Sequence, residues 1–217
     1  MTALFIGVYG ASGFGKEVMP LVRQQYPALA KERFVFIDDG QSGSALNSYP
    51  VLSYDQFLSN PAQHKAVTIA IANSQVREKL AARLTQDNIQ HLAIQAPNTV
   101  ILDEVEIGEG SLLCPFTCLT SNIKIGKFFH TNIYSYIAHD CVIGDYVTFA
   151  PGVKCNGNIH IQDHAYIGTG AVIKQGTPDK PLVIGKGAII GMGAVVTKSV
   201  PAGVTVVGNP ARILEKK

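Results

Sequence analysis

A six-residue repeat constrains this chain more than any other feature of its sequence. Every sixth residue from Ile101 to Ile173 is an anchor position, and ten of these thirteen anchors are Ile or Leu. The whole chain has 36 Ile and Leu residues, so chance placement would give only about two. The residue four places after an anchor is usually small or β-branched, and in an extended chain it lies on the same face as the anchor. The repeat therefore predicts short strands that bury two side chains per hexad.

The repeat is interrupted once. After Ile173 the next anchor is Ile184, and Ile190, Val196 and Ala202 then restore the period. The segment 174–183 amounts to one hexad plus a five-residue insertion, and it contains two prolines, which favour a loop. Insertions in a repeat stack form protruding loops, often near the binding face.

The first 95 residues follow a different pattern. Short β-branched runs predict four strands, at 3–10, 33–38, 66–72 and 91–95. Helical patterns between them predict three helices, at 16–25, 54–58 and 74–87. Strands that alternate with helices are typical of βαβ units with a parallel sheet. We expect Pro20 to kink or delay the first helix, Ser74 to cap the third, and Arg77 to lie on the exposed face of the third.

Composition excludes several classes of protein. Eighteen basic and sixteen acidic residues give a net charge of +2, which is typical of neither an acidic protein nor a polybasic nucleic-acid binder. The 21 glycines form no Gly-X-Y triplet pattern, and 47% of the residues are hydrophobic, which excludes collagen and disorder. No segment resembles a secretion signal or a membrane span, so we expect a cytoplasmic protein. The four cysteines follow no zinc-binding spacing.

The hexads, which often carry glycine directly after the anchor, and the C-terminal stretch VVTKSVPAGVTVVGNPARIL together resemble the hexapeptide-repeat acyltransferases. This resemblance implies a left-handed parallel β-helix in which three hexads form one coil, so that residues 18 apart stack. Most glycines of this half are then expected at the corners of the coils. The resemblance also implies a homotrimer with acyl-CoA sites between subunits. We expect a Rossmann-like nucleotide-sugar-binding domain over 1–96, and the β-helix, with acetyl-CoA binding and catalysis, over 97–217.

Adding the first half of the chain narrows the resemblance. YGASGFGKEV at 9–18, the pair Asp38-Asp39 and the stretch IAHDCVIGD are similar to the sialic acid O-acetyltransferase type of sugar acyltransferase. Within that type, VKCNGNIHI at 153–161 and the pair Asp38-Asp39 most resemble the UDP-N-acetylbacillosamine N-acetyltransferases of bacterial protein and polysaccharide glycosylation.

This resemblance implies transfer of an acetyl group from acetyl-CoA to the 4-amino group of a UDP-linked amino-deoxysugar, without a metal. Two alternatives stay open. One is O-acetylation of a sialic acid or another sugar, and the other is a non-catalytic β-helix scaffold that binds nucleotide sugars.

The candidate catalytic residues follow the anchor Ile137. Acyl transfer to an amine needs a base for the proton that is lost and donors for the developing oxyanion. His139 is the candidate base, by its match to the family, and Asp140 is the candidate residue that orients it, provided that the chain turns there. The 18-residue spacing places His139 between Ser121 and Gly157. A glycine there would let a substrate approach closely and would leave its N–H unshielded, so we expect the Gly157 amide to serve as an oxyanion donor. The alternative for Gly157 is a simple turn.

The candidate substrate contacts lie mostly in the first half. The glycines of GASGFG fall as G-x-x-G-x-G, which is a weak nucleotide fingerprint, but they follow a predicted strand and precede a helix. By resemblance, Ser12, Gly13 and Phe14 would lie near phosphate or sugar, and Asp38 and Asp39 near uridine. A tight turn and a capping acid are the structural alternatives.

Three further groups of residues complete the candidate site. Ala72 stands where relatives carry a substrate-contacting glycine, and Asn132 is a candidate sugar contact or a stacked corner asparagine. Thr148 stands where many relatives carry a histidine on the acetyl-CoA side. The other candidate acetyl-CoA contacts are Thr169, Gly191 and Met192. We expect the remaining histidines to be surface residues, at positions 64, 91, 130, 160 and 164.

Overall fold

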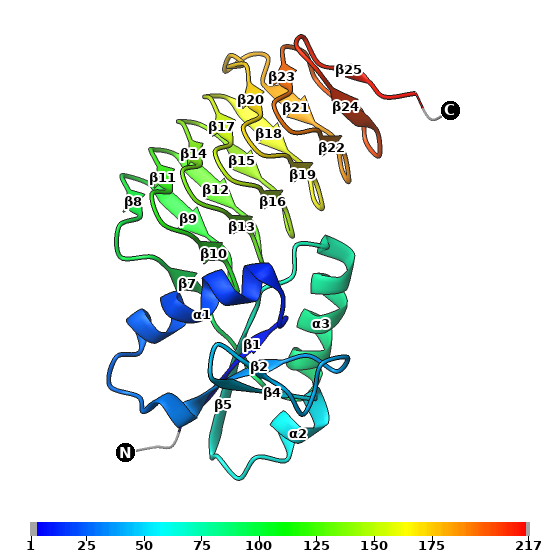
Figure 1. Cartoon of the computed structure of the whole chain (residues 1–217). Helices are drawn as coiled ribbons and strands as arrows, with labels where there is room; N and C mark the ends of the chain where they lie inside the picture. The colour runs from blue at the N-terminus through cyan, green and yellow to red at the C-terminus, as the bar shows by residue number, and fades with distance from the viewer. Residues whose placement is uncertain (1–3, 216–217) are drawn as a thin grey trace. The chain divides into compact units, whose positions relative to one another are not determined.

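The computed structural model describes residues 4–215, and its internal contacts separate a unit that ends at Ile94 from one that begins at Gln95 (Figure 1). In the first unit, a six-stranded sheet has the order β3-β4-β2-β1-β5-β6. Its strands are β1 (Leu4–Tyr9), β2 (Phe34–Ile37), β3 (Ala45–Leu46), β4 (Tyr49–Leu52), β5 (His64–Ile69) and β6 (Gln90–His91). All neighbours are parallel except β3 and β4. The Rossmann-like prediction is thus confirmed for this half.

The order of the strands creates a switch point at the end of β1. The chain runs from β1 to β2 and β4 on one side and then returns to β5 on the other side of β1. In open parallel sheets, ligands bind beyond the carboxyl ends of the strands at such a point. The segments that follow β1 and β5, at 10–15 and 70–73, therefore lie where a ligand is expected.

The helices of this unit differ from the predictions in detail. They are α1 (Gly13–Gln25), the 3-10 helix η1 (Lys31–Arg33), α2 (Tyr54–Leu58) and α3 (Ser74–Gln86). Helix α1 begins three residues earlier than predicted and continues past Pro20. Asn73, instead of Ser74, caps α3, because its side chain accepts a hydrogen bond from the amide of Val76. Among the described residues, no helix has the length and apolar character needed to cross a membrane.

The prediction that Arg77 lies on an exposed face is wrong. Its side chain is fully buried, and Nη1 donates hydrogen bonds to the carbonyl oxygens of Ile71 at 2.7 Å and Ala72 at 3.2 Å. A buried guanidinium needs such partners because leaving it unpaired would be costly. Arg77 therefore fixes the segment that follows β5 at the switch point.

Removing this side chain tests its role. We expect Arg77→Ala to lower the free energy of unfolding by about 2–4 kcal/mol, because the variant leaves two carbonyl groups without their charged donor and opens a cavity. Urea denaturation followed by circular dichroism measures the change. Lys79→Ala, at an exposed position of the same helix, is the matched control, and equal stability of the two variants would contradict the assignment.

The second unit is a parallel β-helix, in which successive strands of the chain join three sheets in turn (Figure 1). The first sheet contains β8 (Val100–Ile101), β11 (Cys118–Leu119), β14 (Tyr136–Ile137), β17 (Lys154–Cys155), β20 (Val172–Ile173) and β23 (Val195–Val196). The second contains β9 (Val105–Ile107), β12 (Ile123–Ile125), β15 (Val142–Ile143), β18 (Ile159–Ile161) and β21 (Leu182–Ile184). The third contains β7 (Ile94–Gln95), β10 (Leu112–Leu113), β13 (His130–Thr131), β16 (Thr148–Phe149), β19 (Tyr166–Ile167), β22 (Ile189–Ile190), β24 (Thr205–Val207) and the antiparallel β25 (Arg212–Ile213).

The register of these sheets follows the repeat. Cys118 pairs with Tyr136 and Tyr136 with Lys154, so successive coils are 18 residues apart, as predicted. The anchors and the residues four places later fill one interior core, which is apolar along most of its length. The predicted strand 91–95 is different, because the structure divides it into β6 and β7, which belong to separate sheets.

The insertion and the last coil change the register. Ile159 pairs with Leu182, so the insertion lengthens this coil by five residues, and Thr177 and Lys180 bridge across the turn that it forms. The next coil is two residues shorter than the regular one, because Ile184 pairs with Val200. The predicted anchor Ala202 is therefore wrong, and it lies exposed while Val200 is buried.

Each regular coil turns through three corners, and most corners have one residue in the left-handed region. The first corner, between the first and second sheets, has Glu104, Asn122, Asp140 and Asn158 at this position. The second corner has Gly110, Phe128, Tyr146, His164, Gly187 and Gly203. The third corner, between the third and first sheets, has Phe116, Tyr134, Gly152, Gly170 and Gly193. The expectation that glycine makes the corners is thus only partly right, since stacked aromatic rings and asparagines occupy many of them.

Candidate active site

The first corner of the β-helix holds the candidate base. His139 lies between β14 and β15, and about half of its side-chain surface is exposed, so a substrate can reach the ring. Its backbone carbonyl accepts from the amide of Asn158 on the next coil at 3.0 Å. The next residue, Asp140, has φ +58° and donates its amide to the carbonyl of Ser121 on the previous coil at 3.1 Å. The corner therefore supplies the chain turn that cooperation between neighbouring residues requires.

The turn brings the two side chains together. His139 Nδ1 lies 2.7 Å from Asp140 Oδ2, and the side-chain amide of Asn122 donates from Nδ2 to Asp140 Oδ1 at 3.2 Å. These two hydrogen bonds, that from His139 first, hold the pKa of Asp140 below its ordinary value. An ionised carboxylate can only accept, so the proton of the contact lies on Nδ1, and in the neutral imidazole the lone pair then lies on Nε2. This is the tautomer that a general base needs.

Gly157 lies against the imidazole. A Cβ at this position would be 2.5 Å from His139 Cε1 and 2.6 Å from Nε2, which is closer than atoms can approach. The Gly157 carbonyl accepts a hydrogen bond from the amide of Gly176 at 3.0 Å, which connects the insertion to the coil that follows His139. We expected the glycine to give a substrate room to approach; the structure shows that it gives room to the histidine ring itself.

The glycine-rich segment after β1 surrounds the start of α1. Gly10 has φ +113°, and a Cβ on Gly15 would be 2.0 Å from the Gly10 carbonyl oxygen, so both positions need glycine. Ser12 and Gly13 are exposed, and the Ser12 side chain forms no cap. Phe14 is half-buried. Helix α1 therefore begins within this exposed segment, at Gly13.

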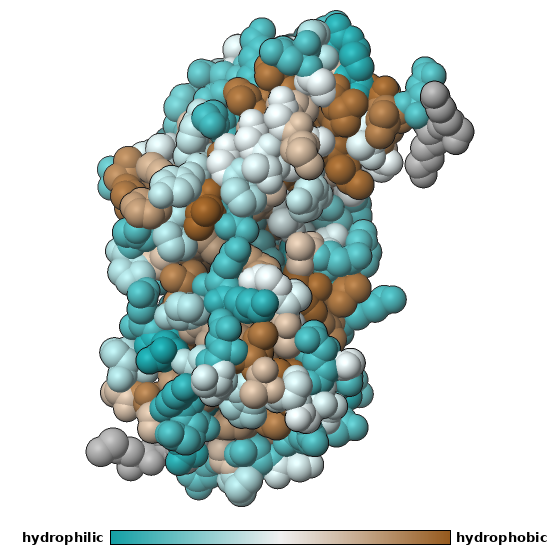
Figure 2. Space-filling view, viewed as in Figure 1, coloured by the Kyte–Doolittle hydropathy of each residue, from teal (hydrophilic) through white to brown (hydrophobic). Residues whose placement is uncertain are grey.

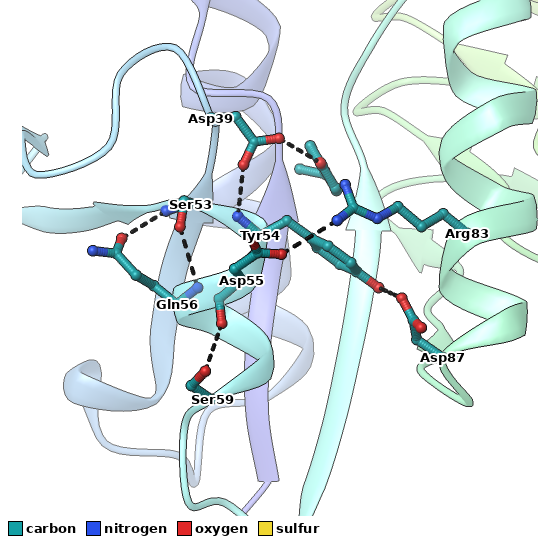
Figure 3. Close-up of polar contacts among 9 residues, drawn as sticks. Asp39, Ser53, Tyr54, Asp55, Gln56, Ser59, Arg83 and Asp87 are labelled. Carbon is teal, nitrogen blue, oxygen red and sulfur yellow. Dashed lines mark hydrogen bonds and ion pairs between the residues drawn. The ribbon is translucent and has the colours of Figure 1, made fainter.

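The two predicted acids, Asp38 and Asp39, have structural partners. Asp39 accepts from the amide of Tyr54 at 2.8 Å and from the hydroxyl of Tyr9 at 3.2 Å, and Figure 3 shows it at the start of α2. Burial, and then this carboxylate, raises the pKa of Tyr9 to about 12, so the hydroxyl stays protonated and donates. Asp38 accepts from the amides of Gly40 at 3.0 Å and Ala11 at 3.3 Å. The acids therefore join the end of β2 to the segments that follow β1 and β4.

Ala72 and Asn132 also have identified environments. Ala72 is exposed in the segment after β5, where its carbonyl accepts from Arg77. Asn132 lies at the third corner, and its side-chain oxygen accepts from the amide of Ile133 at 2.7 Å. This contact is the local role of a corner asparagine.

The candidate acetyl-CoA residues do not lie beside His139 within one chain. Thr148 is on the third sheet, with a relative exposure of 6%, while Thr169, Gly191 and Met192 follow strands of that sheet at the third corner. Met192 is 82% exposed. His139 lies at the first corner, which the width of the β-helix separates from these residues.

The prediction of surface histidines fails at one position. His130 is only 1% exposed, although it lies on a strand position that alternates with the core. Among the described residues, no group of three or more His, Cys, Asp or Glu side chains could hold a metal ion.

Asn122 contacts the candidate catalytic pair but was not among the site residues predicted from the sequence. Asn122 stands 18 residues before Asp140, so the spacing that identified Ser121 and Gly157 around His139 also indicates this contact. Arg77 gave no such signal, because only tertiary packing buries it.

Comparisons with known proteins identify the family of the chain. The family model of the PglD N-terminal domain matches residues 6–84, and that of the bacterial transferase hexapeptide repeats matches 122–157. The chain is 50% identical over 212 residues to GDP-perosamine N-acetyltransferase from Escherichia coli O157:H7, covering 97% of this chain and 96% of the relative. The chain belongs to this family of hexapeptide-repeat sugar N-acetyltransferases.

Two solved structures extend the comparison. WeeI from Acinetobacter baumannii AYE is 84% identical, with a TM-score of 0.97, over 97% of this chain and all of that one. The acetyltransferase domain of PglB from Neisseria gonorrhoeae FA1090 was solved in complex with acetyl coenzyme A; it is 27% identical, with a TM-score of 0.85, over 99% of this chain and all of that one. The predicted family, fold class, enzyme class and use of acetyl-CoA are confirmed, and the comparisons favour the enzyme over the non-catalytic scaffold.

Proposed function

We propose that this enzyme transfers an acetyl group from acetyl-CoA to the 4-amino group of a UDP-linked amino-deoxysugar, with His139 as general base. The observation that carries the mechanism is the contact of 2.7 Å between His139 Nδ1 and Asp140 Oδ2, because it leaves the Nε2 lone pair available. The UDP-linked acceptor rests on the resemblance of 153–161 to the bacillosamine enzymes and on the PglD N-terminal domain match.

The reaction needs one proton to move twice. The neutral amine attacks the thioester carbonyl carbon, a C–N bond forms, and His139 Nε2 takes a proton from the nitrogen. The tetrahedral intermediate then collapses, the C–S bond breaks, and the imidazolium returns the proton to the leaving sulfur. The products are an amide and free CoA. In this proposal the Gly157 amide stabilises the oxyanion, and the Asp140 carboxylate stabilises the imidazolium.

The co-substrate is proposed to bind between subunits. Thr148, Thr169, Gly191 and Met192 lie away from His139 in one chain, so a second copy would have to bring its third corner to the first corner of its neighbour. Exposed apolar side chains near the C-terminal coils favour such packing, and Figure 2 shows hydrophobic residues gathered in this part of the surface. They include Ile189, Met192, Val207, Ile213 and Leu214. A homotrimer, as the resemblance implies, would place three such sites.

The nucleotide is proposed to bind at the switch point of the first unit. The exposed residues Ser12 and Gly13, with Phe14, lie at the start of α1, and the N-terminus of a helix favours a phosphate group. Asp38 and Asp39 already accept hydrogen bonds within the protein, but a carboxylate oxygen can accept more than one. Their proposed contact with uridine thus adds to their structural role. A cytoplasmic location is consistent with the use of acetyl-CoA.

A second acceptor is favoured by a specific observation. The relative that is 50% identical over nearly the whole chain is named GDP-perosamine N-acetyltransferase, so a GDP-linked amino sugar is the competing substrate. O-acetylation of a sialic acid remains the third possibility. All three acceptors use the same base and the same thioester.

A panel of acceptors distinguishes these substrates. We expect release of CoA thiol from acetyl-CoA to be fastest with a UDP-linked 4-amino sugar, with kcat/KM at least about tenfold above that for GDP-perosamine. One well-placed hydrogen bond to the nucleobase, uracil or guanine, can discriminate between the two nucleotides by that factor. CMP-sialic acid and free sialic acid serve as hydroxyl acceptors. Faster turnover of GDP-perosamine would replace the UDP assignment, and turnover only of a hydroxyl acceptor would overturn N-acetylation.

A further inference from the structure

At the first corner of the β-helix, four residues with a left-handed backbone conformation form a column, and the proposed catalytic residue Asp140 is one of them. Glu104, Asn122, Asp140 and Asn158 have φ values of 55°, 58°, 58° and 56°, one in each successive coil. The backbone amide of Asn122 donates to the backbone carbonyl of Asp103 at 3.1 Å, so the backbone of the corner is fixed independently of the Asn122 side chain. The side chain of Asn122 is therefore free to serve its neighbour in the column.

Asn122 and His139 bind opposite oxygens of the Asp140 carboxylate. The Asn122 Nδ2–H donates to Oδ1 at 3.2 Å, while Oδ2 lies 2.7 Å from His139 Nδ1. A carboxylate that is bound on one oxygen can still rotate about its Cβ–Cγ bond. Donors on both oxygens remove this freedom, so the Oδ2 lone pair stays directed at the imidazole.

We propose that Asn122 is a positioning residue that holds the Asp140 carboxylate in the orientation that keeps His139 in its Nδ1–H tautomer. This inference rests on the proposed role of His139 as general base. Asn122 touches neither the ring nor the reacting atoms, so it acts only through Asp140. Asparagine suits this corner because it tolerates the left-handed region and carries a neutral donor, whereas an acid would repel Asp140.

Glycine is the sharpest substitution, because it adopts the left-handed conformation without strain and removes only the side chain. We expect Asn122→Gly to lower kcat about tenfold with little change in KM, since one hydrogen bond to a charged group is lost. Two NMR readouts report the cause. The Asp140 carboxyl should titrate at a higher pH than in the wild type, and the ¹⁵N shifts of His139 should show a smaller share of the Nδ1–H form.

Two further variants make the test decisive. Glu104→Gly removes an exposed side chain from the same column one coil earlier, and we expect it to match the wild type in kcat and in both NMR readouts. Asn122→Asp keeps the size of the side chain but adds a negative charge beside Asp140. The Asp140 carboxyl should then titrate at a still higher pH than in the glycine variant, and kcat should also be lower than in the wild type. It replaces the glycine variant if that variant does not fold.

The outcomes separate this inference from the proposed function. Wild-type kcat and unchanged NMR readouts in Asn122→Gly would overturn the positioning role. A lower kcat with unchanged readouts would also overturn it, because the effect would then be merely structural. If instead the NMR readouts change while His139→Ala keeps the wild-type rate, Asn122 orients the pair but the proposed base mechanism fails.

Discussion

Replacing His139 with alanine is expected to reduce kcat by roughly 10²- to 10⁴-fold, which is the usual contribution of a positioned general base. The substitution removes the imidazole that the Asp140 carboxylate contacts, and it leaves the backbone bonds of the corner intact. The variant should therefore fold, assemble and bind acetyl-CoA like the wild type. Thiol release at saturating acceptor measures kcat, and thermal unfolding with and without acetyl-CoA reports folding and binding.

A second histidine provides the control. His160 lies on β18 in the next coil, where it pairs with Val142 of β15 instead of stacking on His139 or Asp140. We expect His160→Ala to retain a kcat within about twofold of the wild type, as is usual for substitutions away from a site. Wild-type turnover in His139→Ala would remove this histidine from the mechanism, and the amine would then need another route for its proton.

The repeat made the β-helix predictable in detail. A period of six is a local property, and each hexad buries its anchor in the same way, so the register of 18 between Cys118, Tyr136 and Lys154 follows directly from the sequence. The exception lies at the end of the chain. Ala202 continues the period, but Val200 fills the core opposite Ile184, because the last coil is shorter and the larger side chain is the one that is buried.

The first unit was less predictable, since its details depend on contacts distant in sequence. Helical periodicity places Arg77 among polar neighbours, yet the carbonyl groups of Ile71 and Ala72 hold it in the interior. Asp38 and Asp39 were expected to contact a nucleotide, and the structure gives them partners in the segment after β1 and at the start of α2. Residue type and position identified these side chains as important without showing which partners they bind.

The pairing of His139 with Asp140 could be predicted only conditionally. Neighbouring residues on a strand point to opposite faces, and no sequence rule stated that Asp140 turns the chain. The column of left-handed residues at the first corner supplies the missing information, because Asn122 and Asn158 are types that favour this conformation. Asparagine and aspartate spaced 18 apart in such a repeat thus indicate a corner.

Substituting Gly157 with alanine is expected to lower kcat about 10²-fold without unfolding the protein. Gly157 lies outside the left-handed region, so the backbone accepts alanine, but the new methyl group would be 2.5 Å from His139 Cε1. The ring must rotate away, and a misplacement of about 1 Å at a reacting group can cost that factor. Thermal unfolding should change little, since the displaced atoms belong to a half-exposed side chain.

A double-mutant cycle shows through which residue Gly157 acts. In His139→Ala the imidazole is absent and the space is free, so adding Gly157→Ala should cause no further loss of kcat. Strong non-additivity would show that the glycine serves to seat the histidine ring. If the methyl group costs the same factor in both backgrounds, Gly157 acts directly on the substrate, and the hypothesis of close substrate approach would be correct instead.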